Sequence, residues 1–130
     1  QVEAKDSLCA VIETIMAVKE NFKSDYIINV LLGKETSEIL AHRHEDLEVF
    51  GSGEGEDEKV WNAVIRQALI AGYLSKDVEN YGLLKVTPAG SKFLKKPVSF
   101  KIVEDTEKGA GLFRHLLLLN FLRPSGNITI

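Results

Sequence analysis

Residues 56–74 carry the clearest helical pattern of the chain, and they are predicted to contain a helix that ends at Gly72 and around which the rest is organised. At about 100° per residue, one face of this helix is apolar: Val60, Trp61, Val64, Ile65, Ala68 and Leu69. The opposite face contains Lys59, Asn62, Ala63, Arg66 and Ile70. The first face suits a domain core. The second suits contacts to phosphates or base edges, or it is ordinary solvated helix surface.

Three helices are predicted before this central helix, over residues 6–22, 25–32 and 36–41. Asp6 or Ser7 is expected to cap the first helix and Ser24 the second, because a short side-chain oxygen can accept a hydrogen bond from an unpaired backbone N–H. Gly33 is expected to end the second helix. The first helix has an apolar stripe that predicts core packing: Leu8, Val11, Ile12, Ile15, Met16 and Phe22. Residues 47–50 are predicted to be extended and half-buried.

After Gly72 the pattern predicts a β-hairpin, with strands at 73–78 and 83–87. Residues 79–82 form its turn, in which Asn80 and Gly82 are expected to adopt positive φ. Pro88 opens a short helix over 88–94, and residues 98–103 are predicted to form a last strand. Residues 104–111 have the composition of a linker, and residues 112–122 form an apolar run too short to cross a membrane.

The composition is that of one globular domain with a tail. The chain has 130 residues, and its net charge is 16 − 19 = −3, which argues mildly against nucleic-acid binding. Acidic residues crowd into 45–58 and 104–107, however, so a local basic face remains open. The one cysteine, Cys9, lies in an apolar helical pattern and is interpreted as a buried apolar residue. The absence of a signal peptide and of disulfide partners favours a reducing cytoplasm, and the start at Gln1 suggests a piece of a longer protein.

No metal or nucleotide site is expected in this chain. His42 and His44 are two positions apart, and side chains at that spacing do not face each other on a helix. There is no Cys-x-x-Cys pair for zinc. The Gly51–Gly53 turn is not followed by the Lys of a P-loop, and acidic side chains at the start of the central helix would repel a phosphate there: Glu54, Glu56, Asp57 and Glu58.

The order helix, helix, short helix, long helix, hairpin, helix, strand is that of a winged-helix module, a relative of the helix-turn-helix. The predicted fold class is therefore mainly α with a small β component. The predicted winged-helix domain covers residues 1–103, and residues 104–130 are a linker and apolar tail that is disordered, mediates an interaction or is foreign to the domain.

Three motifs, in order along the chain, resemble the RQC domain of RecQ-family DNA helicases, in its bacterial form. The first is His44-x-x-Leu47-x-x-Phe50-Gly51-x-Gly53. The second is Trp61-x-x-x-Ile65-Arg66-Gln67-x-Leu69-Ile70, followed by Leu74. The third is Tyr81-Gly82-x-Leu84-Lys85-Val86-Thr87-x-x-Gly90. The resemblance covers about residues 6–96 and leaves residues 104–130 unexplained.

The resemblance implies a parent protein that is a 3′–5′ ATP-dependent DNA helicase of DNA repair and recombination. It also implies links to replication and the SOS response, and a bacterial, nucleoid-associated, cytoplasmic location. The parent would use ATP, Mg and a structural Zn held by four cysteines, all outside this chain, which itself needs no cofactor and is not expected to hydrolyse ATP. The winged helix would bind double-stranded and forked DNA at the junction without strong sequence preference, and the wing would help to part the strands.

Candidate DNA-binding residues follow from this implication. On the central helix they are Lys59, Asn62 and Arg66. On the wing they are Lys76, Tyr81 and Lys85, and the outer phosphate contacts are Lys34, His42 and Arg43. Tyr81 either stacks on the last base pair or folds back on the core. Bacterial members often have a small hydroxyl residue near position 57, where this chain has Asp57.

Two other functions remain open. The first is a protein-interaction module that docks through the acidic segment 45–58 and the apolar segment 112–122. The second is a sequence-specific repressor that dimerises through 112–122, because a repressor normally reads two half-sites. Salt dependence separates DNA binding from protein docking, and competition between unrelated duplexes identifies a repressor.

Overall fold

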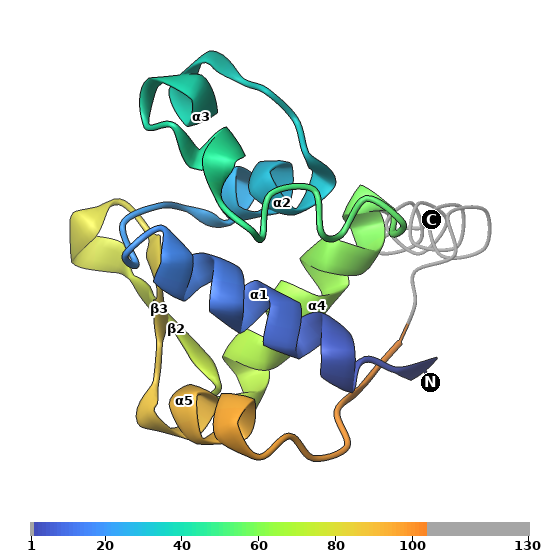
Figure 1. The fold of residues 1–130 in the computed structure, drawn as a ribbon. Helices are drawn as coiled ribbons and strands as arrows, with labels where there is room; N and C mark the ends of the chain where they lie inside the picture. Colours follow the sequence, from blue (N-terminus) through green and yellow to red (C-terminus); the bar gives the residue numbers. More distant parts are fainter. Residues whose placement is uncertain (1, 104–130) are drawn as a thin grey trace, which may run out of the picture.

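Three helices that pack on one another form the core of the computed structural model, which describes residues 2–103 (Figure 1). They are α1 (Lys5–Ala17), α2 (Ser24–Leu32) and α4 (Glu58–Ala71). Each contacts the other two, and α4 crosses α1. Leu8 and Ile12 of α1, Leu31 of α2 and Val64 of α4 are fully buried. The predicted helical core is therefore confirmed.

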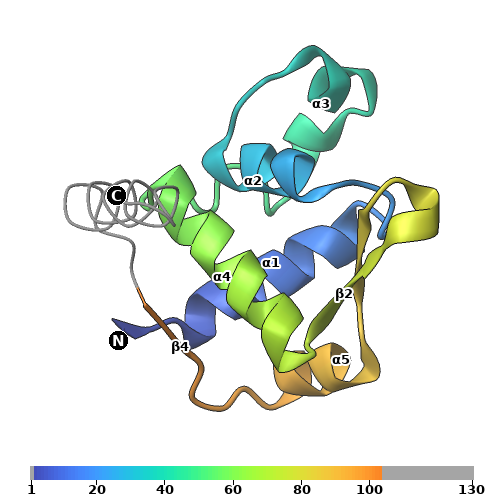
Figure 2. The same ribbon diagram turned by 180° about the vertical axis from the view of Figure 1, so that it is seen from behind.

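The remaining elements surround this core. They are β1 (Val2–Glu3), α3 (Ser37–Ala41), the 3₁₀ turn η1 (His44–Asp46), β2 (Leu74–Asp77), the 3₁₀ turn η2 (Val78–Asn80), β3 (Leu83–Val86), α5 (Pro88–Lys95) and β4 (Lys101–Ile102). Two antiparallel pairs form, β1 with β4 and β2 with β3. The second pair is the wing, which follows α4 directly (Figure 2). This mainly helical arrangement with a small β component confirms the predicted winged-helix fold class.

Helix α4 starts at Glu58, two residues later than predicted, ends at Gly72 as predicted, and has nearly the predicted faces. Asp57 is its N-cap and Gly72, in the left-handed conformation, is its C-cap. Trp61, Val64, Ile65 and Ala68 are buried as expected. Ala63 was expected on the polar face, but it is only 2% exposed. Its methyl group is small enough to fit at the edge of the helix interface, so the buried face is wider than the apolar stripe suggests.

The first helix is shorter than its periodicity predicts, since α1 ends at Ala17 rather than at residue 22. Lys19 and Glu20 both have positive φ, which breaks the helix and starts a loop toward α2. The predicted caps are also wrong. Ala4 is the N-cap of α1, without a side-chain hydrogen bond, and Lys23 rather than Ser24 precedes α2. Met16, expected in the core, is 39% exposed.

Residues 47–56 form turns and not the predicted extended segment. The backbone N–H groups of Gly51 and Gly53 donate to the carbonyls of Val30 and Leu31, each at 2.8 Å. Carbonyls at the end of a helix lack partners within the helix. This segment therefore supplies hydrogen-bond donors to the C-terminal carbonyls of α2. The buried indole of Trp61 donates to the carbonyl of Gly53 at 3.1 Å. A Cβ at position 53 would collide with that indole, which explains why this position is a glycine.

The wing differs from the prediction at its turn. Leu74 pairs with Val86 and Asp77 with Leu83, so the two strands are shorter than expected but in the expected places. Asn80 does not adopt positive φ. It lies in η2, where its amide donates to the Asp77 carboxylate at 2.7 Å. Tyr81 takes the left-handed conformation in its place, with φ 63°, followed by Gly82 at 84°.

The last predicted strand, 98–103, is reduced to Lys101–Ile102, which pairs with β1. The Glu3 carboxylate accepts hydrogen bonds from the Phe100 N–H at 2.8 Å and the Ser99 hydroxyl at 2.7 Å. These hydrogen bonds lower the pKa of Glu3, with the bond from Phe100 contributing most. The two ends of the described chain are thereby joined. The tail predicted at 104–130 lies outside the described residues.

A cluster of four rings holds α3 and η1 against α2. Phe22 stacks on Tyr26 with ring centroids 3.9 Å apart, and His42 and His44 stack on each other at 5.4 Å. Arg43 between the two histidines is left-handed, so the chain turns back and the rings meet despite their spacing. The Tyr26 hydroxyl lies 2.6 Å from Nδ1 of His44. The expectation that these histidines cannot face each other is therefore wrong.

Within residues 2–103, no group of three or more His, Cys, Asp or Glu side chains is placed to hold a metal ion. The helices of the same range are all too short or too polar to cross a lipid bilayer.

We predict that Gly90→Ala destabilises the domain although alanine favours helices. A Cβ at Gly90 would collide with the Tyr73 carbonyl, and such overpacking costs about 1–3 kcal/mol. Gly55 is the matched control, since a Cβ there meets nothing within 4 Å, and Gly55→Ala should be neutral or slightly stabilising. Urea unfolding of the two variants measures the difference. Equal stability of the two would contradict the collision.

A second prediction concerns pH. Burial, and then the charge of His42, lower the pKa of His44, while burial raises the pKa of Tyr26 to about 12, so Tyr26 keeps its proton. A histidine with a lowered pKa in the folded state binds protons more readily when unfolded. Stability should therefore decrease as pH falls below about 6.5. Melting temperatures between pH 7.5 and 5.5 should decrease less in His44→Gln than in the wild type, and identical slopes would refute the prediction.

Candidate nucleic-acid interface

The outer face of α4 presents three of the predicted DNA-binding residues. Lys59, Asn62 and Arg66 are all exposed, and their spacing of three and four residues places them along one side of the helix. In Figure 2 this helix lies in front of α1 and runs into β2. The Asn62 amide donates to the Glu58 carbonyl at 3.2 Å, which holds it along the helix. Ile70, farther along α4, is 72% exposed.

The N-terminal end of α4 is acidic. The Asp57 carboxylate accepts a hydrogen bond from the Lys59 N–H at 3.1 Å and caps the helix. Glu56 and Glu58 beside it are exposed. These carboxylates stabilise the positive end of the helix dipole, but they also repel an anion. A phosphate would therefore meet the cations along the side of α4 and not its N-terminus.

The tip of the wing presents an aromatic side chain. Tyr81 is 84% exposed, so the alternative in which it folds back on the core is wrong. The stem of Lys76 lies beside Gly82 at the same tip. Lys85 lies on the other face of the two-stranded ribbon, because it is opposite Ser75 whereas Lys76 is opposite Leu84. The tip therefore brings together Lys76 and Tyr81 but not Lys85.

The wing is fixed to the core by hydrogen bonds that β3 donates. The Leu84 N–H donates to the Phe22 carbonyl at 2.9 Å, and the Val86 N–H donates to the Glu20 carboxylate at 2.7 Å. The loop between α1 and α2 thus holds β3 through one backbone and one side-chain hydrogen bond. The sequence did not reveal this role of Glu20, which was predicted to lie inside the first helix. Because α1 ends at Ala17, Glu20 lies in the following loop, and its side chain can reach the wing.

The base of the wing is fixed to the end of α4. The Thr87 hydroxyl donates to the Gly72 carbonyl at 2.6 Å, and the Thr87 N–H donates to the Tyr73 carbonyl at 3.2 Å. Both acceptors belong to the connection between α4 and β2. The orientation of the wing relative to α4 is therefore set by backbone groups next to Gly72.

The three predicted outer contacts lie apart from α4. Lys34 follows α2 and is exposed, while His42 and Arg43 follow α3, which lies on the outer side of α2 (Figure 1). Arg43 is 3.7 Å from the Asp46 carboxylate in an exposed ion pair, and His42 belongs to the ring cluster. The structure therefore groups the nine candidates into α4, the wing and the α2–α3 region.

Comparison with known proteins identifies the family. The family model of the RQC domain matches residues 1–111. The ATP-dependent DNA helicase RecQ of Haemophilus influenzae is 30% identical over 86 residues, which are 65% of this chain and 14% of that protein. The protein of the same name from Pasteurella multocida is 31% identical over 71 residues, which are 55% of this chain and 11% of that protein.

The chain thus spans a small part of the length of these relatives. The family model, in contrast, includes every residue that the structure describes and all three motifs quoted above. The resemblance drawn from those motifs is confirmed, and the chain belongs to the RQC domain family.

Proposed function

We propose that this chain is the duplex-DNA-binding module of a RecQ-type 3′–5′ ATP-dependent DNA helicase, and that it holds the duplex at the junction through α4 and the wing. One observation carries the proposal: the exposed cations of α4 and the exposed aromatic tip of the wing belong to two elements that are directly joined and linked by the hydrogen bonds of Thr87. Membership of the RQC family supports it.

The side of α4 supplies the phosphate contacts. Lys59 and Arg66 are exposed on the same face, with Asn62 between them. Cations that meet phosphates release the counterions of DNA, and this term is independent of sequence. Such contacts fix the position of a duplex without reading it, which suits a helicase that must act on any sequence.

The wing tip supplies the contact to the end of the duplex. Tyr81 points out from the turn and Lys76 lies beside it. An aromatic ring stacks on any base because every base has a π face. Tyr81 would cover the last base pair while Lys76 meets the adjoining phosphate. The wing is short, so duplex holding is its main role and strand parting follows from the motor.

The motor belongs to other parts of the proposed parent protein. ATP, Mg and a structural Zn would be bound there, and this chain would contribute position and not catalysis. Roles in repair, recombination, replication and the SOS response, and a cytoplasmic, nucleoid-associated location, follow from the same proposal. The apolar segment 112–122 is the candidate for self-association.

The proposal predicts that Lys59→Ala/Arg66→Ala weakens binding to a blunt duplex by about tenfold or more. Removing two phosphate contacts should also reduce the slope of log K against log salt by about 2. Fluorescence anisotropy with a labelled duplex at several salt concentrations measures both quantities. Lys95→Ala/Lys101→Ala is the matched control, because it removes the same charge from exposed positions elsewhere.

Three outcomes would count against the proposal. An equal loss of duplex affinity in both double variants would mean that net charge alone governs binding. Competition that depends on the duplex sequence would identify a repressor. Absence of binding at low salt would favour a protein partner for the exposed acidic residues of segment 45–58.

A further prediction tests the fixation of the wing. Glu20→Ala removes the acceptor of the Val86 N–H and should loosen the wing, which weakens duplex binding several-fold while far-UV circular dichroism stays unchanged. Glu20→Gln retains an acceptor oxygen at the same place and should bind like the wild type. Amide hydrogen exchange at Val86 measures the loosening. Equal exchange in the two variants would show that the carboxylate contact does not hold the wing.

A further inference from the structure

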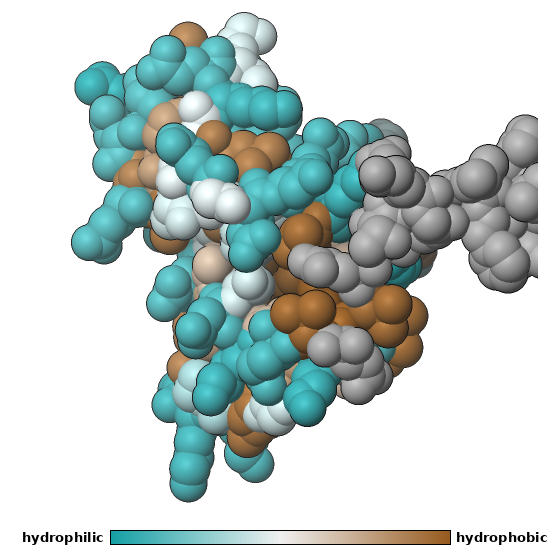
Figure 3. Space-filling model, turned by 90° about the vertical axis from the view of Figure 1, so that its right-hand side faces the viewer, coloured by the Kyte–Doolittle hydropathy of each residue, from teal (hydrophilic) through white to brown (hydrophobic). Residues whose placement is uncertain are grey.

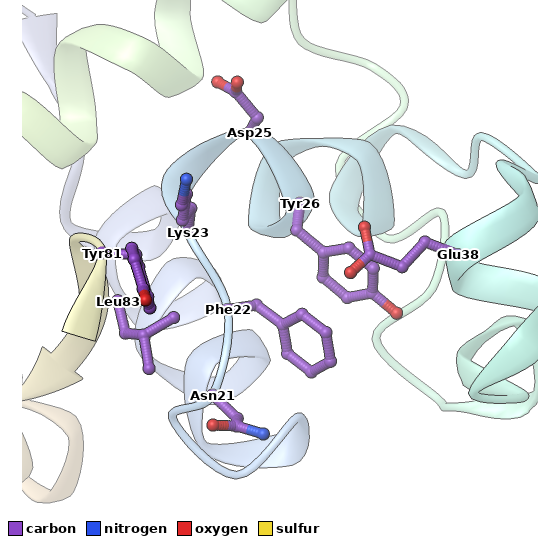
Figure 4. A pocket seen from close by; sticks show the side chains of 8 residues that line it. All are labelled: Asn21, Phe22, Lys23, Asp25, Tyr26, Glu38, Tyr81 and Leu83. Atoms are coloured by element: carbon purple, nitrogen blue, oxygen red, sulfur yellow. The ribbon is translucent and has the colours of Figure 1, made fainter.

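A groove opens between the wing, the loop from α1 to α2, and helices α2 and α3 (Figure 4). Its volume is about 580 Å³, which is within the range of small-molecule sites and far too small for a duplex. Six of its lining side chains carry the inference: Asn21, Phe22, Lys23, Tyr26, Glu38 and Tyr81. We refer to it as the wing groove. Tyr81 alone is shared with the surface proposed to hold the duplex.

The wing groove contains an aromatic platform. Phe22 and Tyr26 are stacked, with ring centroids 3.9 Å apart and an interplanar angle of 14°. Tyr26 is only 6% exposed, whereas Phe22 is half-buried. Tyr26 covers one face of the Phe22 ring, the rings of His42 and His44 are nearly perpendicular to it with centroids 5.1 and 5.5 Å away, and Phe22 lines the groove. Figure 4 shows Phe22 between Tyr26 and the wing, where Tyr81 and Leu83 form the opposite wall.

The polar groups of the groove suit the edge of a nucleobase. Asn21 offers an amide that both donates and accepts, and Glu38 offers a carboxylate that accepts. Lys23 is the one cation of the lining, against the two carboxylates of Asp25 and Glu38. This balance disfavours a run of several phosphates. It permits a single phosphate beside Lys23, with an uncharged ring inside the groove.

The groove also adjoins the wing tip, which is the proposed contact to the end of the duplex. Tyr81 at the wing tip forms one wall, and the Leu84–Phe22 hydrogen bond of 2.9 Å holds the loop that carries the platform against β3. A base that passes the wing tip therefore meets the Phe22 ring on the adjacent loop.

We propose that the wing groove binds one unpaired nucleotide of a strand that separates from its partner at the wing. The base stacks on Phe22, its edge meets Asn21 and Glu38, and its phosphate meets Lys23. This inference rests on the proposed function, since the wing tip must lie at the end of the duplex. It adds a single-strand site to the duplex surface, and it makes the chain selective for forks over blunt ends.

The experiment compares the 130-residue chain on two DNAs with the same paired sequence, one blunt and one forked. The fork has 2-aminopurine, whose fluorescence decreases on stacking, at the first unpaired position of either strand. We expect the fluorescence of one of the two labelled strands to decrease on binding. We also expect about five- to tenfold tighter binding to the fork than to the blunt duplex, the effect of stacking one base.

Phe22→Leu is the main variant, because leucine retains apolar bulk and removes the ring. It should abolish the fluorescence decrease and the preference for the fork, and leave affinity for the blunt duplex unchanged. Asn21→Ala/Lys23→Gln changes two exposed side chains and should weaken fork binding without affecting folding. If Phe22→Leu does not fold, this double variant provides the test. A fork with an abasic unpaired position retains the phosphate but not the stacked base, so it should lose most of the preference over the blunt duplex.

The outcomes are distinct. Absence of blunt-duplex binding would overturn the proposed function and with it this inference. Blunt-duplex binding without a fluorescence decrease on either strand, or with an increase, would overturn the groove alone. The same conclusion would follow if Phe22→Leu lost equal affinity for both DNAs, or if the abasic fork bound as tightly as the intact fork.

Discussion

The structure depends on the two faces of α4. One face must be buried, because Trp61, Val64 and Ile65 supply the centre of the core between α1 and α2. At about 25 cal/mol per Å² of apolar surface, burying side chains of this size is the main source of stability in a domain this small. The rotation of α4 is thereby fixed, and the opposite face, with Lys59 and Arg66, must be exposed. Stability and the candidate interface are two results of one constraint.

The position of the wing is set by the same helix. Gly72 ends α4, and hydrogen bonds from Thr87 to Gly72 and Tyr73 fix where the ribbon begins. A two-stranded ribbon is marginally stable alone. The loop before α2 attaches this ribbon to the core, because the Phe22 carbonyl and the Glu20 carboxylate accept hydrogen bonds from β3. This attachment keeps the Tyr81 tip in a defined place relative to the cations of α4, as the proposed junction-binding surface requires.

The distribution of charge explains how a chain with net charge −3 fits the proposed DNA surface. The acidic residues near position 57 cap α4 and complement its dipole, so they serve the fold at one end of the helix. The cations lie along its side. The wing groove adds a third environment, in which carboxylates, an amide and a stacked aromatic pair stand together. Duplex phosphates and an unpaired base would thus meet chemically different surfaces.

The sequence alone determined the helices, the wing, the fold class and the family, because these follow from local periodicity, from Gly72 and Pro88 as breakers, and from motifs of fixed spacing. It also placed Lys59 and Arg66 on one exposed face. It did not determine the end of α1, the turn at Tyr81 or the stacking of His42 on His44. These depend on the left-handed residues Lys19, Glu20, Tyr81 and Arg43, conformations that non-glycine residues rarely adopt and that only tertiary contacts select. The attachment of Glu20 to β3 and the wing groove follow from those turns, so the tertiary structure alone decided them.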